Sequence, residues 1–264
     1  MIRKRSLLKL LLSSLLVLVL AGCESSGPSK GPVTGVIGAM NEEVETLIGD
    51  LSHDKVKTIA GMEFHQGKFD GKETVVVKSG VGKVNAAACA QILIDVFHVD
   101  QIINTGVAGS VDPSLSIGDI VISTEAVQHD VDVTPFGYEP GVIPDLSDSV
   151  FHASTDLVKS ATAAVSAVAP EVKFLEGRVV SGDQFISADA DKKRLAETFG
   201  GLCAEMEGAA VAHTAWLNQV PFVIIRAISD KADHSASMEF AEFEQLAIRR
   251  LVRLIREMLP AMKR

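Results

Sequence analysis

The feature that most constrains the fold is a regular alternation of apolar runs with amphipathic stretches between residues 33 and 262. The apolar runs are rich in β-branched residues and predict strands, whereas the stretches between them place apolar residues at helical spacing. Such an alternation predicts an α/β fold: a single domain with a largely buried, mixed or parallel β-sheet. The expected strands are 33–37, 74–78, 101–104, 118–124, 174–180 and 222–228, and the expected helices are 41–51, 84–97, 157–169 and 240–262.

Length and charge limit the function classes. The chain has 264 residues, of which 47% are hydrophobic, so one large domain can bury a real core without a second domain. Aromatic residues make up only 5%, so we expect an aliphatic core. The formal net charge of −9 would be repelled by a nucleic acid, which argues against a nucleic-acid partner.

The first residues have the pattern of an export signal. A basic segment, residues 3–9, precedes an apolar run, residues 10–21, that is shorter than a membrane-spanning helix. The run ends in Leu20-Ala21-Gly22-Cys23, which resembles a bacterial lipobox. We therefore expect a lipoprotein signal peptide over residues 1–22 and a lipid on Cys23; an uncleaved anchor helix is the alternative.

Residues 23–32 are rich in Ser, Gly and Pro, the composition of a flexible tether, and the folded domain is expected over residues 33–264. The chain would thus be exported and anchored by lipid to a bacterial membrane. Glu24 follows the lipidated cysteine where an Asp would favour inner-membrane retention, so the outer membrane or cell surface is favoured over the inner membrane.

The other cysteines and the histidines give no sign of a metal site. Cys89 and Cys203 lie in apolar surroundings, and nothing in the sequence places them near each other, so buried free thiols are favoured over a bridge. The histidines are scattered, without a Cys/His cluster at zinc spacing. We expect neither a metal nor a cofactor.

Carboxylates recur where the expected strands end. In α/β sheets ligands bind outside the carboxyl ends of the strands. The glycine-rich strand ends match no dinucleotide or P-loop motif and are explained equally well by tight turns. Asp230 follows the apolar strand 222–228, where it could line a site or cap the next helix, and position alone does not decide between these. The other carboxylates at strand ends are Glu42, Glu43, Asp183, Glu205, Glu207 and Asp233.

A series of ordered segments between Val33 and Met262 resembles one family. The family is the bacterial 5′-methylthioadenosine/S-adenosylhomocysteine nucleosidases, within the purine nucleoside phosphorylase superfamily. The segments are Gly38-Ala-Met-Asn-Glu-Glu-Val44, Lys78-Ser-Gly-Val-Gly-Lys-Val84, Ile103-Asn-Thr-Gly-Val-Ala-Gly109, Ser181-Gly-Asp-Gln-Phe-Ile186, Ala204-Glu-Met-Glu-Gly-Ala-Ala210 and Val223-Ile-Ile-Arg-Ala-Ile-Ser-Asp-Lys-Ala-Asp233.

The resemblance implies a mixed, partly barrel-like sheet wrapped by helices, in a homodimer. It implies an enzyme that hydrolyses the N-glycosidic bond of 5′-methylthioadenosine and S-adenosylhomocysteine, with 5′-deoxyadenosine as a further substrate. The products would be adenine and the 5′-thio-ribose, which belong to methionine and purine salvage.

The resemblance also implies the catalytic roles. Asp230 would protonate adenine N7 so that the base leaves as a neutral molecule, and Ser229 would orient that carboxyl. Glu43 would hold and deprotonate the water that attacks C1′, with Arg226 and Glu207 positioning the water. Glycosidases divide the labour between two carboxyl groups in the same way, around an oxocarbenium-like transition state.

The substrate contacts follow from the same resemblance. Met206 and Glu207 would contact the ribose, Phe185 would stack on adenine, and the Ile186 backbone would read the edge of the base. Taken alone, Phe185 would be assigned to the core. The other implied contacts are Ala108, Gly109 and Glu205 at the site, and Val81, Phe240 and, from a neighbouring subunit, Val133 and Phe136 around the 5′-thioalkyl group.

Val107 departs from the family pattern, because many members carry Ser there. One hydrogen bond near the base or ribose is therefore not expected in this chain.

Three other readings share part of this pattern. A phosphorylase would need cationic side chains at the first strand end, where this chain has Asn41-Glu42-Glu43. An aminofutalosine-type nucleosidase would use the same residues on a different 5′ group. A surface lipoprotein that only binds nucleosides, or an adhesin, would not need to retain Glu43, Glu207 and Asp230 together.

Overall fold

The apolar runs of the sequence form one mixed sheet in the computed structural model, which describes residues 31–262. The expected signal peptide, most of the tether and Cys23 lie outside the described residues. The strands are β1 (Thr34–Gly38), β2 (Ser52–Ile59), β3 (Met62–Phe69), β4 (Lys72–Lys78), β5 (Gln101–Ser110), β6 (Ile120–Gln128), β7 (Phe151–His152), β8 (Phe174–Ser181), β9 (Cys203–Glu205) and β10 (Phe222–Asp230).

The amphipathic stretches form most of the helices. These are α1 (Asn41–Gly49), α2 (Lys83–Phe97), α3 (Thr155–Val168), α4 (Asp189–Phe199), α5 (Gly208–Leu217) and α6 (Ala236–Ala261), with a short 3-10 helix, η1 (Thr134–Phe136). Within residues 31–262, none of these helices has the length and apolar character needed to span a membrane.

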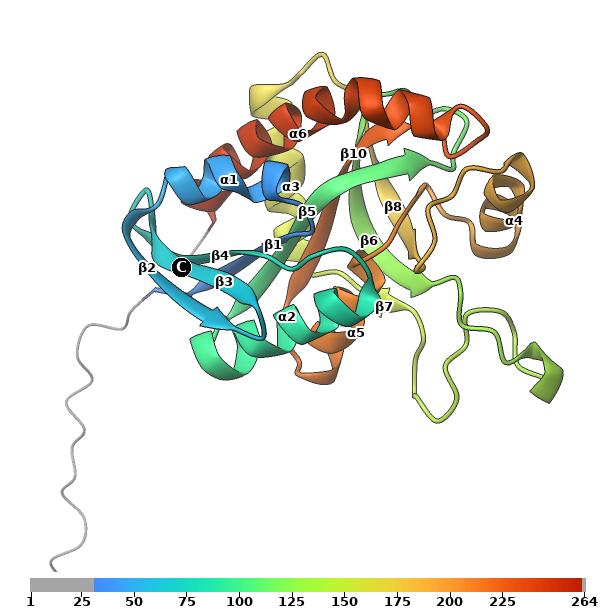
Figure 1. The fold of residues 1–264 in the computed structure, drawn as a ribbon, viewed down its shortest axis with the longest axis horizontal. Coiled ribbons are helices and arrows are strands. Elements are labelled where there is room, and N and C mark those ends of the chain that lie inside the picture. Colours follow the sequence, from blue (N-terminus) through green and yellow to red (C-terminus); the bar gives the residue numbers. More distant parts are fainter. Residues whose placement is uncertain (1–30, 263–264) are drawn as a thin grey trace, which may run out of the picture. The chain divides into compact units, whose positions relative to one another are not determined.

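The sheet closes on itself at one end and stays open at the other. Strand β10 pairs with both β6 and β5, so the order β10-β6-β8-β9-β5 forms a ring, from which β1, β4, β3 and β2 extend as an open arm (Figure 1). Strand β10 runs parallel to β5 and antiparallel to β6. The expected mixed, partly barrel-like sheet is thereby confirmed.

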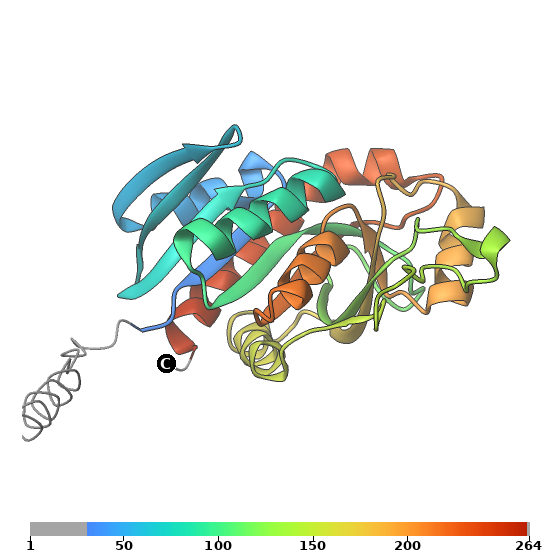
Figure 2. The same ribbon diagram turned by 90° about the horizontal axis from the view of Figure 1, so that it is seen from below.

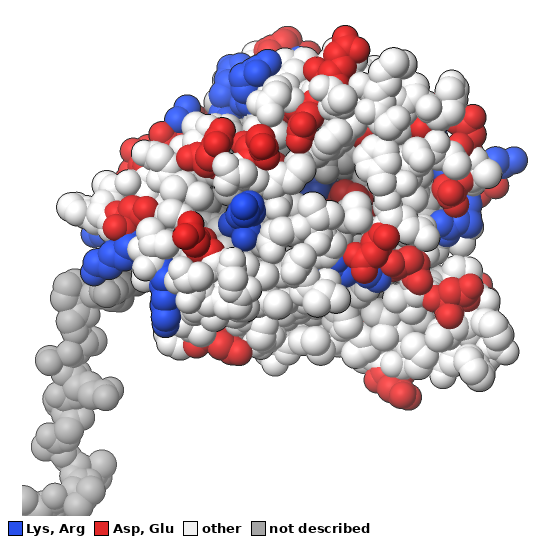
Figure 3. All heavy atoms as spheres, in the orientation of Figure 1, with Lys and Arg blue, Asp and Glu red and all other residues white. Residues whose placement is uncertain are grey.

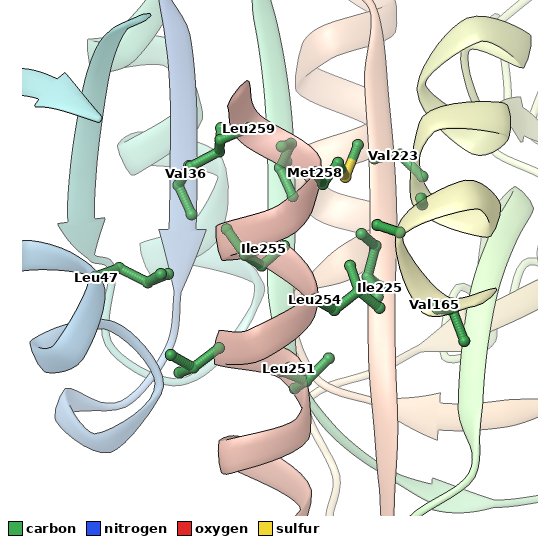
Figure 4. Packing of buried hydrophobic residues seen from close by; sticks show 14 of the residues in the cluster. Val36, Leu47, Val165, Val223, Ile225, Leu251, Leu254, Ile255, Met258 and Leu259 are labelled. Atoms are coloured by element: carbon green, nitrogen blue, oxygen red, sulfur yellow. The ribbon is translucent and has the colours of Figure 1, made fainter. Parts of the chain in front are cut away.

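Helices cover both faces of the sheet. Helices α1, α3 and α6 pack on one face, and α2 and α5 lie side by side on the other (Figures 1 and 2). The aliphatic residues of α6 point toward the sheet and its neighbouring helices (Figure 4). Ile255 of α6, for example, is fully buried in the cluster that includes Val36 of β1 and Leu47 of α1.

Both remaining cysteines are free and buried, Cys89 in α2 and Cys203 in β9, as expected. Burial raises the pKa of both thiols well above its ordinary value, so they stay neutral and behave as small apolar residues of the core.

Strand β5 corrects one expectation. The sequence predicted a strand over 101–104 followed by a glycine-rich loop, but β5 continues to Ser110. The glycines instead make space for two carboxyl groups: a Cβ on Gly106 would lie 2.7 Å from Glu43 Oε1, and one on Gly109 would lie 2.7 Å from Asp230 Oδ1. These glycines therefore let the two carboxyl groups approach the strand backbone closely.

Several elements were not anticipated, namely the β2–β3 hairpin, β7, β9, α4 and α5. Strand β2 is almost entirely exposed and shows no alternation of apolar and polar residues. Helix α5 is apolar nearly all round and almost wholly buried, so it lacks the one-sided periodicity that identifies a surface helix.

Candidate active site

The carboxyl ends of β1, β5 and β10 open onto one cavity of about 380 Å³. The face of the molecule seen in Figure 3 is hollowed near its centre, and residues without charge make up most of the surface around the hollow. The cavity is lined by Ala39, Met40, Glu43, Val81, Val107, Ala108, Gly109, Phe185, Ala204, Glu205, Met206, Glu207, Ser229, Asp230, Ser237 and Phe240.

Glu43 lies in the first turn of α1, directly after β1. Its Oε2 accepts hydrogen bonds from the N–H groups of Ala39 (2.7 Å) and Met40 (3.0 Å), and its Oε1 accepts one from Val107 (3.1 Å). Burial raises the pKa of Glu43, although these N–H groups and the charge of Arg226 oppose the shift. A carboxylate oxygen can accept two hydrogen bonds, so Oε1 retains capacity for a water in the cavity.

Asp230 is the last residue of β10. Its Oδ1 accepts a hydrogen bond from the Ala232 N–H (2.8 Å), and its Oδ2 accepts one from the Ser229 hydroxyl (2.9 Å). Burial raises the pKa of Asp230, and the charges of Glu239 and Asp233 act in the same direction. The protonated form that an acid needs is thereby favoured.

The alternative role of Asp230 as a helix cap is not what the structure shows. Helix α6 begins at Ala236, and its N-cap residue is Ser235. Asp230 lies upstream of the helix, with its carboxyl group at the cavity.

Arg226 is only 1% exposed and is held entirely by protein groups. Its Nη2 lies 2.5 Å from both Glu205 Oε2 and Asn104 Oδ1, its Nη1 donates to the backbone oxygens of Asn104 and Ile225, and its Nε donates to Glu205. These contacts use all five N–H donors of a guanidinium. Arg226 therefore acts on Glu43 through its charge, and its expected role in positioning the water stays a prediction.

Glu205 is likewise occupied within the protein. In addition to Arg226, it accepts hydrogen bonds from the hydroxyl of Ser181 and from the N–H groups of Glu207 (3.1 Å) and Gly208 (2.7 Å). Although it lines the cavity, its carboxylate is committed to anchoring the β9–α5 connection and Arg226. Its contacts within the chain are those of a supporting residue, and the expected contact with substrate stays a prediction.

Glu207 retains a free oxygen. Its Oε1 accepts a hydrogen bond from the Gly82 N–H (2.7 Å), and Oε2 makes no hydrogen bond to residues 31–262. Burial, with the charge of Glu205, raises the pKa of Glu207 to about 7. The free Oε2 could accept a hydrogen bond from a ribose hydroxyl.

The aromatic residues form one wall of the cavity. The Phe185 ring is 48% exposed and meets the Phe240 ring edge to face, with 5.9 Å between the ring centroids. Phe185 is therefore not a core residue. Ile186 and Phe185 line a small recess that continues from the cavity to Asp230.

Two of the expected residues do not reach the cavity of their own chain. Val133 and Phe136 lie at η1, and Phe136 is 82% exposed. Neither lines the cavity, so a contribution from them requires a second subunit, as the resemblance implied.

Sequence analysis missed several supporting residues: Asn104, Ser181 and the backbone of Gly82. Asn104 and Ser181 were visible at strand ends, but their partners Arg226 and Glu205 are distant in the sequence. Outside the cavity, Asp189, Asp233 and His234 bring their possible ligand atoms within 4.8 Å of one another.

Comparisons with known proteins agree with this geometry. The sequence profile described as "Phosphorylase superfamily" matches residues 33–260. A 5′-methylthioadenosine/S-adenosylhomocysteine nucleosidase from Shewanella loihica is 43% identical over 210 residues, which cover 79% of this chain and 90% of that protein.

Solved structures give the same result. A nucleosidase of this type from Colwellia psychrerythraea, crystallised with adenine, has a TM-score of 0.84 and 40% identity, covering 88% of this chain and 96% of that one. A futalosine hydrolase from Helicobacter pylori has a TM-score of 0.81 and 32% identity, covering 87% and 97%. This chain belongs to the phosphorylase superfamily and, within it, to the 5′-methylthioadenosine/S-adenosylhomocysteine nucleosidases.

Proposed function

We propose that this enzyme hydrolyses the N-glycosidic bond of 5′-methylthioadenosine and S-adenosylhomocysteine, releasing adenine and the 5′-thio-ribose. The observation that carries the proposal is that Glu43, Glu207 and Asp230 line the same cavity. One carboxyl group can serve the leaving base while another serves the water.

Departure of the base depends on Asp230. As the bond between C1′ and the base breaks, the bonding electrons move onto adenine, and the proton of Asp230 passes to N7. Adenine then leaves as a neutral molecule. The raised pKa of Asp230 favours its protonated form, and Ser229 and Ala232 hold the carboxyl group in place.

Attack by water depends on Glu43. The ribose carries positive charge in the transition state, and a carboxylate near C1′ stabilises that charge as well as taking a proton from the water. Arg226 lies close enough to Glu43 to favour its ionised form. Glu207, through its free Oε2, would accept hydrogen bonds from the ribose hydroxyls.

The charge of the cavity favours water over phosphate as the nucleophile. Four carboxylates and no Lys, Arg or His are among the residues that line it. A phosphate would be repelled by these carboxylates and would find no cationic side chain to bind it. The same set of residues would suit an aminofutalosine-type substrate, which differs only in the 5′ group.

We further propose that a homodimer completes the 5′ end of the pocket. Val81 lines the cavity and is half exposed in the single chain, which leaves that end open. The segment with Val133 and Phe136 projects from the rest of the domain in Figure 1 and presents a large apolar side chain to solvent. Val133 and Phe136 of the partner subunit would cover the thioalkyl group.

The anchoring of the enzyme by a lipid on Cys23, at the outer membrane or cell surface, is also a proposal. It rests on the basic segment, the apolar run and the Leu20-Ala21-Gly22-Cys23 sequence. The enzyme would then act on nucleosides outside the cytosol.

The activity is tested with the purified protein and a panel of 5′-methylthioadenosine, S-adenosylhomocysteine, 5′-deoxyadenosine, aminofutalosine and inosine, with and without phosphate. We expect adenine release from the thioadenosine substrates without phosphate and no release from inosine. Strict dependence on phosphate would overturn the hydrolase assignment. Preference for aminofutalosine would move the chain to that substrate class.

The anchor is tested in whole cells. Metabolic labelling with a fatty acid should mark the wild-type chain and not a Cys23→Ala variant. Intact cells should release adenine from added 5′-methylthioadenosine. Activity confined to lysed cells would contradict an outward-facing enzyme.

A further inference from the structure

Three charged residues next to the cavity form a closed ring of contacts, which we call the clasp: Lys83, Asp130 and Asp183. The Lys83 Nζ lies 2.5 Å from Asp130 Oδ1. The other Asp130 oxygen accepts a hydrogen bond from the Asp183 N–H (3.0 Å), and Asp183 Oδ1 accepts one from the Lys83 N–H (2.8 Å). None of these residues lines the cavity.

The clasp joins three connections that are distant in sequence. Lys83 begins α2 after the turn that follows β4, Asp130 follows β6, and Asp183 follows β8. Every link combines a charged group with a backbone N–H or an opposite charge, so each hydrogen bond is charge-assisted and stronger than a neutral one.

The ion pair in the clasp is shielded from solvent. The side chains of Lys83 and Asp130 are 18% and 21% exposed. Burial would raise the pKa of Asp130, but the hydrogen bonds from Lys83 and the Asp183 N–H outweigh it and hold this pKa below its ordinary value. A second acceptor, Gln128 Oε1, lies 3.1 Å from the Lys83 Nζ and fixes the ammonium further.

The backbone turn before Lys83 is tightly constrained. Gly82 has φ of +97°, a conformation that favours glycine, and a Cβ there would lie 3.1 Å from Asp183 Oδ1. The N–H of Gly82 donates to Glu207, and the adjacent N–H of Lys83 donates to Asp183. Movement of Lys83 would therefore displace the donor that holds Glu207.

The other side of the clasp carries the base-binding residues. Asp183 stands two residues before Phe185, which faces the cavity. The clasp therefore fixes two parts of the pocket. One is the Gly82 N–H, which holds Glu207, the carboxylate expected to bind the ribose. The other is the start of the segment with Phe185, which is expected to bind adenine.

We propose that Lys83 is a positioning residue of this nucleosidase, which holds the ribose-binding and adenine-binding sides of the pocket in register through Asp130 and Asp183. The inference rests on the proposed function for the identity of the ligand. Lys83 does not touch the substrate; it acts through Gly82, Glu207 and Phe185.

The test is the variant Lys83→Met, which keeps the aliphatic stem and removes the charge. We expect the KM for 5′-methylthioadenosine to rise roughly tenfold, because small displacements of binding groups are costly, while kcat stays within about twofold. The Kd of adenine, measured by calorimetry, should rise as well, because Phe185 shifts with Asp183. In the Lys83→Arg variant, which retains the charge, the KM and the adenine Kd should return to values near those of the wild type.

The matched control is Lys68→Met. Lys68 also forms an ion pair, at 3.5 Å from Glu73, but across the β3–β4 pair, and neither residue lines the cavity. It should leave KM, kcat and the adenine Kd unchanged. The double variant Lys83→Met/Asp130→Asn should bind no more weakly than Lys83→Met, because both changes break the same contact.

Wild-type values of KM and adenine Kd in Lys83→Met would overturn the inference. The inference would also be overturned if Lys83→Met only lowered the fraction of active enzyme and left KM and Kd unchanged. That result is expected of a residue with a merely structural role. Absence of adenine release by the wild type would instead refute the proposed function, whereas the calorimetric arm would still test the clasp.

Discussion

At the residue scale, the chemistry depends on the surroundings that the fold gives to each carboxyl group. Asp230 is buried among groups that favour its protonated form, whereas Glu43 is buried but receives backbone N–H donors and the charge of Arg226. Glu205 forms a buried ion pair with Arg226. Residues with the same functional group therefore have different roles because their surroundings differ.

The first prediction concerns the acid. Asp230→Asn keeps the shape of the side chain but removes the proton donated to N7, so kcat should fall by about 10²–10⁴-fold. The fall is measured as adenine release from 5′-methylthioadenosine. Adenine binding by calorimetry should persist, which shows that the pocket is intact. A variant with near wild-type kcat would exclude Asp230 as the acid.

The second prediction concerns pH. The pKa of Glu207 is about 7, and its ionised form accepts from the ribose hydroxyls, so kcat/KM should fall as the pH drops below about 7. At high pH it should fall again when Asp230 loses its proton, giving a bell-shaped profile. Glu207→Gln should lower kcat/KM and remove the acid limb. An acid limb that persists in this variant would assign it to another group.

At the scale of elements, strand β5 supplies backbone for the site in place of side chains. Its glycines let Glu43 and Asp230 approach from the neighbouring β1–α1 and β10 segments, and the register pairs Arg226 with Gly106. A strand that carried side chains at these positions would exclude the catalytic groups.

The third prediction follows for Gly106→Ala. The added Cβ would lie 2.7 Å from Glu43 Oε1 and should displace the carboxylate, lowering kcat by at least tenfold, since misplacement of catalytic groups by about 1 Å costs up to about 100-fold. Gly49→Ala, where a Cβ meets nothing within 4 Å, is the control and should retain activity. Full activity of Gly106→Ala would contradict the proposed approach of Glu43.

The fourth prediction concerns helix α6, which joins the faces of α1 and α3 to the sheet (Figure 4). Ile255→Ala removes a fully buried side chain and should reduce the free energy of unfolding by about 2–5 kcal/mol, measured by denaturant titration. An exposed α6 position, Arg249→Ala, should change it by less than about 0.5 kcal/mol. Equal effects of the two changes would contradict the packing.

At the scale of the whole molecule, we propose that the cavity of one chain is complete on the adenine side and open at the 5′ end. Asp230, Phe185 and Ile186 of one chain line the recess that is proposed to hold the base. Phe136 is exposed and does not line the cavity of its own chain, which is consistent with the proposed homodimer.

The fifth prediction tests that assembly. Phe136→Asp should weaken the dimer, seen by sedimentation, because an exposed apolar side chain that packs at an interface is replaced by a charge. The KM for 5′-methylthioadenosine should rise while the adenine Kd stays unchanged, since adenine lies away from the 5′ end. A monomeric wild type with normal KM would refute the dimeric pocket.

The sequence alone determined the α/β class, most strands and helices, and the identity of the main carboxylates. It did so because hydrophobic periodicity is a local property and because Glu43, Glu207 and Asp230 stand beside recognisable segments. It did not predict β2 or α5. Nearly all residues of β2 are exposed, and α5 is buried on nearly all sides, so neither element shows a periodic pattern.

Only the tertiary structure decided how these groups are used. It showed that Glu205, Asn104 and Ile225 occupy the donors of Arg226, that Gly106 belongs to a strand, and that Lys83 contacts Asp130 and Asp183. These contacts join segments that are tens of residues apart. Their geometry depends on the closing of the sheet into a ring, which no local pattern specifies.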